Sequence, residues 1–459
     1  MKQLLSGPTT VNLELTELCN VKCRHCYNFW RDESMGSATL DVDRLDRVID
    51  RMIEAEVFHV ILTGGEPFSK FDLLTHALER LRDTDITTSC NSNLMLVSDE
   101  KIKALRDLGL DHILTSLPSI DPALNDYIMS AVGSYEKIIS GIRCTVDNGI
   151  RVSVNMVITR QNFEQVYEMG RLVSELGCQK LFVTRSVPPT YSEENDDSEY
   201  ALTPEEQKFA LDEALRVKED FGIMIGTLVS YPLCFLSDLQ KYADFVGRGC
   251  PAQAGHRMSL NADGTVHACV HEEESYGNVF DQPIREVYQG TMRKWHDSSF
   301  HYEGCAGCTY SDVCESGCSM TAIARYGAHE AKDPLFVGPH NFSTHFEVAD
   351  QSLLEDVKNG LAFKAPARLR FRDEGGFYLL NIRWGNSITI ETRVAEFLMR
   401  HRDSGELFTL EEFGVDDAGT LANLFAKDAV EAPAWTGFKG DKEKQGMSID
   451  FARLKTASL

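Results

Sequence analysis

Residues 11–27 read VNLELTELCNVKCRHCY, a short β-rich run that leads directly into three cysteines. The pattern of VNLELT predicts a strand, and Cys19, Cys23 and Cys26 lie on the short loop after it. Three thiolates on one loop can bind an iron–sulfur cube while leaving its fourth iron without a protein ligand. A zinc knuckle or a ferredoxin-type cluster is the alternative, but each takes a fourth ligand, and no further cysteine follows close by.

Outward from this loop, the chain from Val11 to about Tyr231 alternates short β-rich runs with longer amphipathic stretches. Strands are predicted at residues 11–16, 58–64, 85–91, 112–116, 152–158 and 180–185. Residues 40–56 are typical of the intervening helices, with apolar positions three and four residues apart. Strands that alternate with helices form parallel sheets with crossover connections. The sequence therefore predicts an α/β fold, a partial (β/α)6 barrel of TIM type.

The cysteine loop resembles a known family. Cys-x3-Cys-x2-Cys followed directly by Tyr27 resembles the cluster loop of radical S-adenosylmethionine (SAM) enzymes. The second predicted strand ends in Gly64, Gly65, Glu66 and Pro67, which match the GGEP motif of that family. Glycines permit close backbone approach, and a carboxylate such as Glu66 can hold an ammonium group or a neighbouring polar contact.

The resemblance implies a cofactor site. The open iron of the Cys19, Cys23 and Cys26 cluster is expected to chelate SAM, with residues 64–67 at the SAM amino group. One electron then cleaves SAM to a 5′-deoxyadenosyl radical. Ser116 matches a position that often contacts the SAM ribose, although a serine that only satisfies its own loop is the alternative. Asn155 and Arg185 could likewise contact SAM or be purely structural, so we assign neither of them a function.

A second cysteine-rich region begins at residue 250 and is rich in glycine and turn residues. Its cysteines are Cys250, Cys269, Cys305, Cys308, Cys314 and Cys318. Their spacing resembles the SPASM domain, which carries auxiliary 4Fe-4S clusters in peptide-modifying radical SAM enzymes. The resemblance assigns Cys250, Cys269 and Cys318 to a first auxiliary cluster and Cys305, Cys308 and Cys314 to a second. One or two zinc-ribbon sites are the alternative.

This region also departs from the SPASM pattern. No cysteine follows Cys318, although the family often has one near residues 333–336, and His256 stands where a further ligand sometimes occurs. Each auxiliary cluster is thus left with three cysteines. Either His256, His340, Asp333 or another side chain completes a cluster, or an iron is open to substrate, or the second cluster is not built. The remaining cysteines, Cys90, Cys144, Cys178 and Cys234, are interpreted as packing residues.

A third region follows residue 366 and contains three predicted strands, at ARLRFRDE, GGFYLLNIRW and SITIE, and the amphipathic helix TRVAEFLMRH. It resembles the winged-helix peptide-binding domain called a RiPP recognition element, where RiPP denotes a ribosomally made and post-translationally modified peptide. Such a domain captures a leader peptide along an exposed strand edge. Arg368, Arg370 and Arg372 alternate along the first strand, so they either meet an acidic leader or form a solvated face. A cap on the cluster domain is the alternative role.

The composition disfavours nucleic-acid-binding and membrane-spanning proteins. The 459 residues have a formal net charge of −24, which disfavours a nucleic-acid partner. Residues 221–237 are uncharged but too short and polar to span a membrane, and no signal sequence is recognisable, so we expect a cytoplasmic protein without a membrane partner. In a reducing compartment, 13 cysteines indicate metal binding or catalysis.

These observations predict a cytoplasmic radical SAM and SPASM enzyme that modifies a precursor peptide by hydrogen abstraction. Its expected cofactors are SAM, the cluster that binds it, and one or two auxiliary 4Fe-4S clusters, with flavodoxin or ferredoxin as electron donor. The expected domains are residues 1–240, 241–348 and 360–432, with a polar tail at 433–459. Alternatives are a maturase of a folded protein or tetrapyrrole precursor, and an electron-transfer or peptide-binding protein without turnover. The sequence identifies no catalytic residue.

Overall fold

The computed structural model describes residues 4–28, 38–187, 200–246, 249–339, 351–383, 386–414 and 417–435. The chain divides into two compact units, which are described separately. The first comprises Met1–Ser237 and Arg248–His340, and the second comprises Asp238–Gly247 and Asn341–Leu459. The predicted barrel and the cysteine-rich region therefore share one unit.

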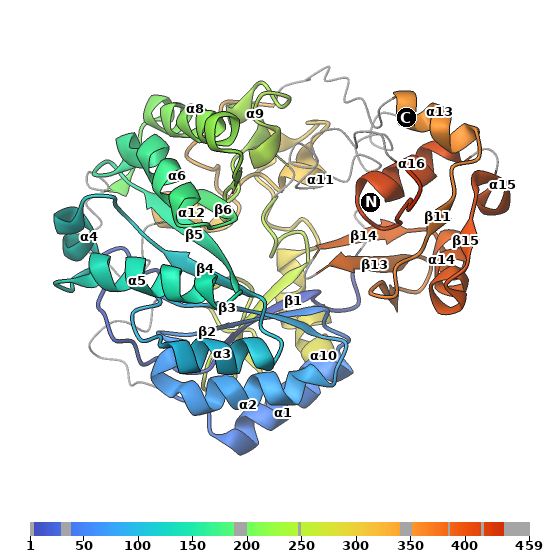
Figure 1. Ribbon diagram of the computed structural model, residues 1–459. Helices are drawn as coiled ribbons and strands as arrows, with labels where there is room; N and C mark the ends of the chain where they lie inside the picture. The colour runs from blue at the N-terminus through green and yellow to red at the C-terminus, as the bar shows by residue number, and fades with distance from the viewer. Residues whose placement is uncertain are drawn as a thin grey trace. The chain divides into compact units, whose positions relative to one another are not determined.

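The first unit is built on a ten-stranded sheet with the order β10-β9-β8-β1-β2-β3-β4-β5-β6-β7 (Figure 1). Its parallel strands are β1 (Thr10–Glu14), β2 (His59–Thr63), β3 (Thr87–Asn91), β4 (His112–Ser116), β5 (Arg151–Ile158), β6 (Lys180–Arg185) and β7 (Met224–Gly226). The first six are the predicted strands, so the α/β fold is confirmed. The seventh lies in the uncharged stretch of residues 221–237.

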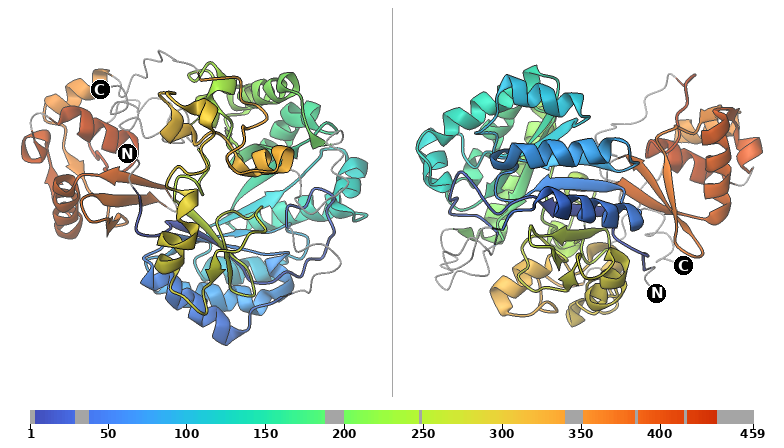
Figure 2. Two further views of the ribbon diagram at one scale, coloured as in Figure 1. Left: turned by 180° about the vertical axis from the view of Figure 1, so that it is seen from behind. Right: turned by 90° about the horizontal axis from the view of Figure 1, so that it is seen from below.

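Helices connect these strands and cover the outer face of the sheet (Figure 2). They are α1 (Val42–Glu54), α2 (Phe71–Arg82), α3 (Asp99–Asp107), α4 (Pro122–Met129), α5 (Ser134–Asp147), α6 (Val166–Glu175) and α8 (Pro204–Phe221). Their starts follow from capping side chains: Asp41 accepts a hydrogen bond from Arg44 N, and Thr203 forms a capping box with Glu206. No described helix is long and apolar enough to cross a membrane.

The two faces of the parallel strands differ because successive side chains point to opposite sides. Val11 and Leu13 of β1 are fully buried apolar residues. Most of the alternate positions are polar and bond across the strands, although Ile61, Leu114 and Phe182 share this face. For example, His59 Nδ1 lies 2.9 Å from Thr87 Oγ1, and Thr184 Oγ1 donates to Asn155 Oδ1 at 2.6 Å. The face opposite the helices is therefore mainly polar.

The cysteine-rich region extends the same sheet. Strand β8 (Arg257–Leu260) pairs in parallel with β1, and β9 (Thr265–His267) and β10 (Gly277–Asn278) continue in antiparallel pairing. Short helices follow: α10 (Ile284–Gln289), α11 (Ser311–Cys314) and α12 (Ser319–Tyr326). Sequence periodicity did not predict that β8 adds directly to β1, because sheet partners distant in sequence leave no local pattern.

The second unit has its own hydrophobic core. Strands β12 (Arg370–Asp373), β13 (Tyr378–Arg383) and β14 (Asn386–Ile390) form an antiparallel sheet, and β11 (Phe363–Lys364) pairs with β15 (Leu407–Phe408). The helices are α13 (Gln351–Lys358), α14 (Thr392–Ser404), α15 (Leu410–Phe413) and α16 (Ala418–Ala426). Buried residues from these elements, including Val357, Leu380, Leu398 and Phe408, form the core. The predicted strands and helix are present.

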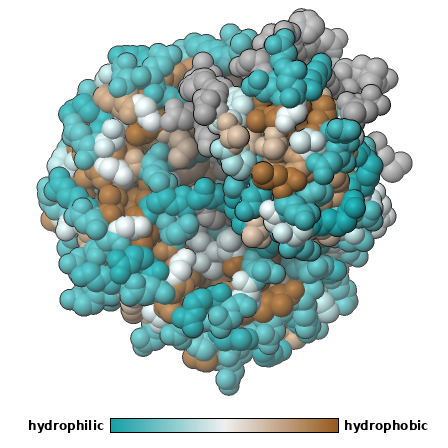
Figure 3. Space-filling model, turned by 45° about the vertical axis from the view of Figure 1, so that its right-hand side comes forward, coloured by the Kyte–Doolittle hydropathy of each residue, from teal (hydrophilic) through white to brown (hydrophobic). Residues whose placement is uncertain are grey.

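The three arginines expected to form one face differ in exposure: Arg372 is buried, whereas Arg368, which precedes β12, is exposed. Arg372 and Glu374 are both buried and form an ion pair, with 2.6 Å between Nε and Oε1. Arg370 donates to Asn381 Oδ1 at 2.8 Å, and Arg368 pairs with Glu431. These side chains are committed to partners inside the second unit. Figure 3, coloured by hydropathy, shows a mainly hydrophilic surface with interspersed hydrophobic residues on the face that is drawn.

Candidate functional site

The predicted cluster loop directly follows β1. Cys19, Cys23 and Cys26 are all partly exposed on this loop. Backbone contacts fix the loop: Arg24 N donates to Ile128 O at 2.8 Å, and Cys26 N donates to Cys23 O at 3.2 Å. The structure therefore places the three predicted ligands on one anchored, solvent-accessible loop at the carboxyl edge of the parallel strands.

Gly64 and Gly65 pack against the backbone that leads into this loop. Gly65 N donates to Thr16 O and Glu66 N donates to Leu18 O, each at 2.8 Å. A Cβ atom on Gly64 would lie 2.3 Å from Thr16 O, and one on Gly65 would lie 2.4 Å from Leu18 O. Both contacts are too short for a side chain, so the two glycines are required for the approach of the cluster loop itself.

Glu66 is fully buried and accepts hydrogen bonds from three donors. These are Phe68 N at 3.0 Å, Ser92 Oγ at 2.8 Å and Asn93 N at 2.8 Å. Burial raises the pKa of the carboxyl group, and these hydrogen bonds oppose the rise. Asn93 Nδ2 in turn donates to Asn20 Oδ1 at 2.7 Å. Glu66 thus joins the ends of β2 and β3 to the residue after Cys19, which supports a positioning role.

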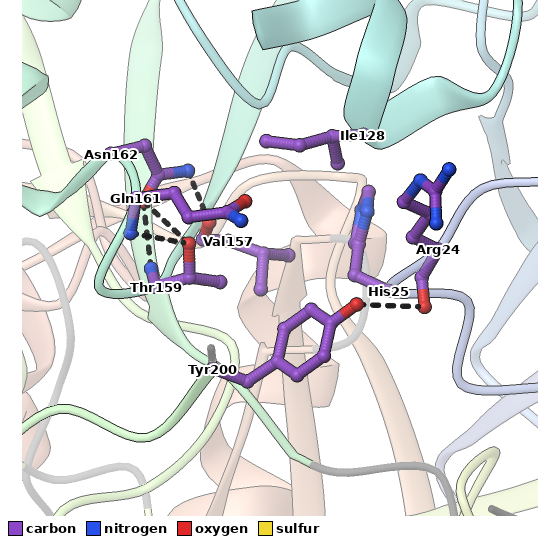
Figure 4. Close-up of a pocket in the computed structure, with 8 residues that line it drawn as sticks. All are labelled: Arg24, His25, Ile128, Val157, Thr159, Gln161, Asn162 and Tyr200. Carbon is purple, nitrogen blue, oxygen red and sulfur yellow. Dashed lines mark hydrogen bonds between the residues drawn. The ribbon is translucent and has the colours of Figure 1, made fainter. Parts of the chain in front are cut away.

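A pocket lies beside the cluster loop (Figure 4). It is lined by Arg24, His25, Ile128, Val157, Thr159, Gln161, Asn162 and Tyr200. The Tyr200 hydroxyl donates to Arg24 O at 3.5 Å, and Asn162 Nδ2 donates to Val157 O at 2.9 Å. His25 Nδ1 is buried and has no hydrogen-bond partner among the described residues. Burial lowers the pKa of His25 to about 4, so its ring is neutral at pH 7.

The remaining sequence candidates at the strand ends differ in what they contact. Ser116 ends β4, is half-buried, and stands beside Asn155 of β5 in the sheet register. Arg185 is buried and pairs with Asp333, with Nη1 at 2.9 Å from Oδ1 and Nη2 at 2.5 Å from Oδ2. Asp333 also accepts from Cys318 N at 2.9 Å. The Asp333 carboxylate is thus held by an arginine and backbone N–H groups, which argues against its use as a cluster ligand.

Cys250, Cys269 and Cys318 come together near the start of β8. Burial raises the pKa of Cys269 well above its ordinary value, and the charges of Cys250 and Cys318 add to this rise. Burial likewise raises the pKa of Cys250 to about 12, with a further contribution from Cys318. One cysteine can raise the pKa of another through its charge only when the two lie close together, so the three thiols are neighbours. The buried Arg257 guanidinium lies beside Cys250 and Cys269, where it offsets thiolate charge.

The cysteine sulfurs are not spaced as the ligands of a single zinc ion. Four thiolates at about 2.3 Å from one zinc ion lie roughly 3.8 Å apart. Within the described ranges, the one set of three candidate ligand atoms closer than 4.8 Å to one another is Glu272, Glu274 and His329, which contains no cysteine. Among the described residues, no three cysteine sulfurs therefore lie within 4.8 Å of one another, as the ligands of a single zinc ion would.

Cys305, Cys308 and Cys314 form a second group with a fourth thiol that the sequence analysis assigned to packing. Burial raises the pKa of Cys305, and the charges of Cys308 and Cys234 raise it further. Burial also raises the pKa of Cys314, with Cys234 and Cys305 contributing. Cys234 lies in the short helix α9 (Leu233–Leu236). The sequence signal that could have identified Cys234 was the absence of a cysteine after Cys318, because it leaves this group one thiol short.

His256, a candidate for completing a cluster, contacts a residue outside the cysteine groups. His256 Nδ1 lies 3.2 Å from Thr9 Oγ1, and His340 lies outside the described residues. His271, which sequence reasoning missed, has Nδ1 at 3.5 Å from Cys269 Sγ. Its ring packs on Tyr27 with 4.7 Å between centroids. Since Tyr27 follows Cys26, this aromatic pair connects the cluster loop to the first auxiliary group.

Two family models match the chain. Residues 13–173 match the Radical SAM superfamily, and residues 250–309 match SPASM, an iron–sulfur cluster-binding domain. The chain is 25% identical to the pre-heme d1 synthase of Dinoroseobacter shibae over 343 residues, which cover 70% of this chain and 84% of the synthase. It is 26% identical to the PqqA peptide cyclase of Rhodopseudomonas palustris over 341 residues, covering 71% of this chain and 86% of the cyclase.

The fold is similar to that of a solved structure. Streptococcus suis SuiB bound to precursor peptide SuiA superposes with a TM-score of 0.58 and 18% sequence identity. The similarity covers 72% of this chain and 76% of SuiB. It confirms the fold class of the matched part.

Proposed function

Because the chain is a radical SAM enzyme with a SPASM domain, we propose that it modifies a ribosomally made precursor peptide by hydrogen abstraction. The radical SAM domain binds a 4Fe-4S cluster together with SAM, and the SPASM domain binds auxiliary iron–sulfur clusters. When bound, the SAM-cluster pair supplies a 5′-deoxyadenosyl radical by one-electron cleavage of SAM. A flavodoxin or ferredoxin is the proposed source of the electron.

The residues of the cluster loop fit this cofactor pair. Cys19, Cys23 and Cys26 offer three thiolates and leave one iron free for SAM. Glu66 and the two glycines before it hold this loop against the ends of β2 and β3. The unpartnered His25 Nδ1 in the adjacent pocket is a polar group that a bound ligand can satisfy. These residues bind and orient the cofactor, and Ser116 is a proposed further contact.

The polar face of the barrel supports a peptide substrate. Side chains such as Asn155, His59 and Ser89 line this face and form hydrogen bonds across the strands. A peptide backbone presents donors and acceptors along its length, which such a surface can match.

The observation that carries the proposal is the second unit, which has its own core and a three-stranded antiparallel sheet. Among the residues that the structure describes, the two outer strands of the order β12-β13-β14 each pair with one strand, so an extended segment can add at an edge. Holding a flexible peptide there raises its effective concentration at the radical site. Because Arg372 is buried in an ion pair, its charge is not available to a peptide. We therefore propose that backbone hydrogen bonds, rather than arginine charge, hold the peptide at this edge.

A tetrapyrrole substrate is the second candidate, and the similarity to a pre-heme d1 synthase favours it. The match covers 70% of this chain, and the match to the PqqA peptide cyclase covers 71%, so the extent of the similarity does not separate the two candidates. Both candidates share the cofactor chemistry. They differ in what the second unit would bind.

The test uses anaerobically purified full-length protein with SAM and a chemical reductant. Precursor peptides encoded beside the gene and a sirohaem-type tetrapyrrole are each incubated with it, and mass spectrometry records the products. We expect a mass change in a peptide and none in the tetrapyrrole. Conversion of the tetrapyrrole alone would replace the proposal with the second candidate.

A truncated chain tests the docking role of the second unit. Leu353 and Val357 belong to the core of that unit, so the truncation ends at His340 rather than after Gly360. We expect this chain to retain its iron and uncoupled SAM cleavage while peptide binding falls at least tenfold. Loss of iron with normal peptide binding would instead indicate that the second unit is a cap.

A further inference from the structure

The second auxiliary group is incomplete if only the cysteines of the SPASM pattern are counted. Cys305, Cys308 and Cys314 supply three thiolates, and no cysteine follows Cys318 in the chain. The structure brings Cys234, which lies in α9 between the barrel and the SPASM region, to this same group. A fourth thiol is therefore available from a part of the chain outside the pattern.

Direct contacts place α9 against the second group. The Leu233 backbone N–H donates to Cys314 Sγ at 3.4 Å, so the residue before Cys234 touches one of the predicted ligands. Leu233 and Leu236 are buried, which anchors the helix. The Cys234 sulfur therefore occupies a fixed position beside the group.

Backbone N–H groups from two segments of the chain face the Cys234 sulfur. Backbone N–H groups of Val337 and Gly338 form hydrogen bonds to its sulfur and lower its pKa against the larger effect of burial. Hydrogen bonds to cluster sulfurs are a common feature of iron–sulfur sites, where they set the reduction potential. Cys308 is the charged neighbour that raises the pKa of Cys234.

The cysteines that only fill the core of the same unit have different surroundings from Cys234. Cys178 is 4% exposed, and burial alone raises the pKa of its thiol. Cys90 is fully buried, and its charged neighbour is Glu66. Cys234 is partly exposed, has Cys308 as its charged neighbour, and is itself a charged neighbour of Cys305 and Cys314. Burial in an apolar core therefore explains Cys90 and Cys178 but not Cys234.

We propose that Cys234 is the fourth protein ligand of the second auxiliary 4Fe-4S cluster, together with Cys305, Cys308 and Cys314. The inference rests on the proposed assignment of those three cysteines to a cluster. A cluster with four thiolates has no iron free for substrate, so this one transfers electrons. It also links α9, which follows the last barrel strand, to the SPASM region through metal.

The test compares the full-length wild type with Cys234→Ala, Cys234→Ser and the matched control Cys178→Ala, all reconstituted anaerobically. Iron and sulfide per chain, Mössbauer spectra and EPR spectra of oxidised and reduced samples are recorded. Wild type and Cys178→Ala should hold about twelve irons in three cubes. Cys234→Ala should lose one to four irons, through a three-iron form with its own EPR signal or through loss of the cluster. Cys234→Ser should keep the fold and shift the spectrum of one cluster.

The iron content of the wild type and of the variants distinguishes whether Cys234 is a ligand from whether the second auxiliary cluster exists. Twelve irons and unchanged spectra in both Cys234 variants would overturn the role of Cys234 while leaving the second cluster in place. About eight irons in the wild type would show that the second cluster is not built and would overturn both.

Alkylation of the wild type provides a measurement that does not depend on the folding of a variant. Native protein is treated with iodoacetamide before and after iron chelation, and labelled cysteines are identified by mass spectrometry. Cys234 should become labelled together with Cys305 and Cys308 only after chelation, while the buried Cys178 stays unlabelled. Labelling of Cys234 in the cluster-loaded protein would refute the inference.

Discussion

Gly65→Ala should damage the cluster loop through backbone contact alone. The new Cβ atom would lie 2.4 Å from Leu18 O and 2.6 Å from Glu17 O. Both atoms belong to the backbone just before Cys19, so no flexible side chain can move aside. Either the end of β2 or the start of the cluster loop has to shift.

The size of the effect follows from the interactions that such a shift breaks. Gly65 N to Thr16 O and Glu66 N to Leu18 O are the hydrogen bonds at risk, and each contributes roughly 1 kcal/mol. Overpacking adds about 1–3 kcal/mol. We therefore expect the free energy of unfolding of the cluster-free protein to fall by about 2–5 kcal/mol. The displaced loop should also bind less iron and less SAM.

Gly7→Ala is the matched control in the same unit. Its Cβ would meet the Arg285 side chain at 3.4 Å, an ordinary contact. Chemical denaturation of both cluster-free variants, followed by iron analysis after reconstitution, measures the two effects. If Gly65→Ala unfolds at the same denaturant concentration as Gly7→Ala and holds the same iron, the packing argument is wrong.

Replacing all three cysteines of the cluster loop by alanine should remove roughly four irons and abolish 5′-deoxyadenosine formation; undiminished SAM cleavage would disprove the assignment. Arg185→Met leaves the Asp333 carboxylate buried without its cation, so the free energy of unfolding should fall by about 3–5 kcal/mol. The double substitution Arg185→Met with Asp333→Leu removes both charges, so denaturation experiments should show that much of the lost stability returns. Burial raises the pKa of Glu272 to about 8, so the folded state binds the extra proton and stability should fall as the pH rises from about 4.5 through 8. Glu272→Gln should flatten this dependence in denaturation midpoints measured from pH 5 to 9, and an unchanged slope would contradict the assignment.

Local sequence determined the cluster loop and the barrel strands. The run at residues 11–16 and the cysteines after it form one continuous segment, so strand, loop and ligand spacing are all recorded in adjacent residues. The six predicted strands correspond to β1–β6 for the same reason, because strand formation depends on a short apolar pattern. The spacing from Cys305 to Cys318 likewise marked the SPASM region.

Tertiary structure alone decided the contacts between distant segments. The sequence near Cys234 looks like an apolar strand connection, and its place beside Cys305 appears only after β7 has turned the chain toward the SPASM region. The pairing of Arg185 with Asp333 and the burial of Arg372 were equally invisible. A periodic pattern reports which side of a strand or helix a residue occupies, but not which remote residue meets it there. That partner is fixed by sheet order and packing, which join segments far apart in the chain.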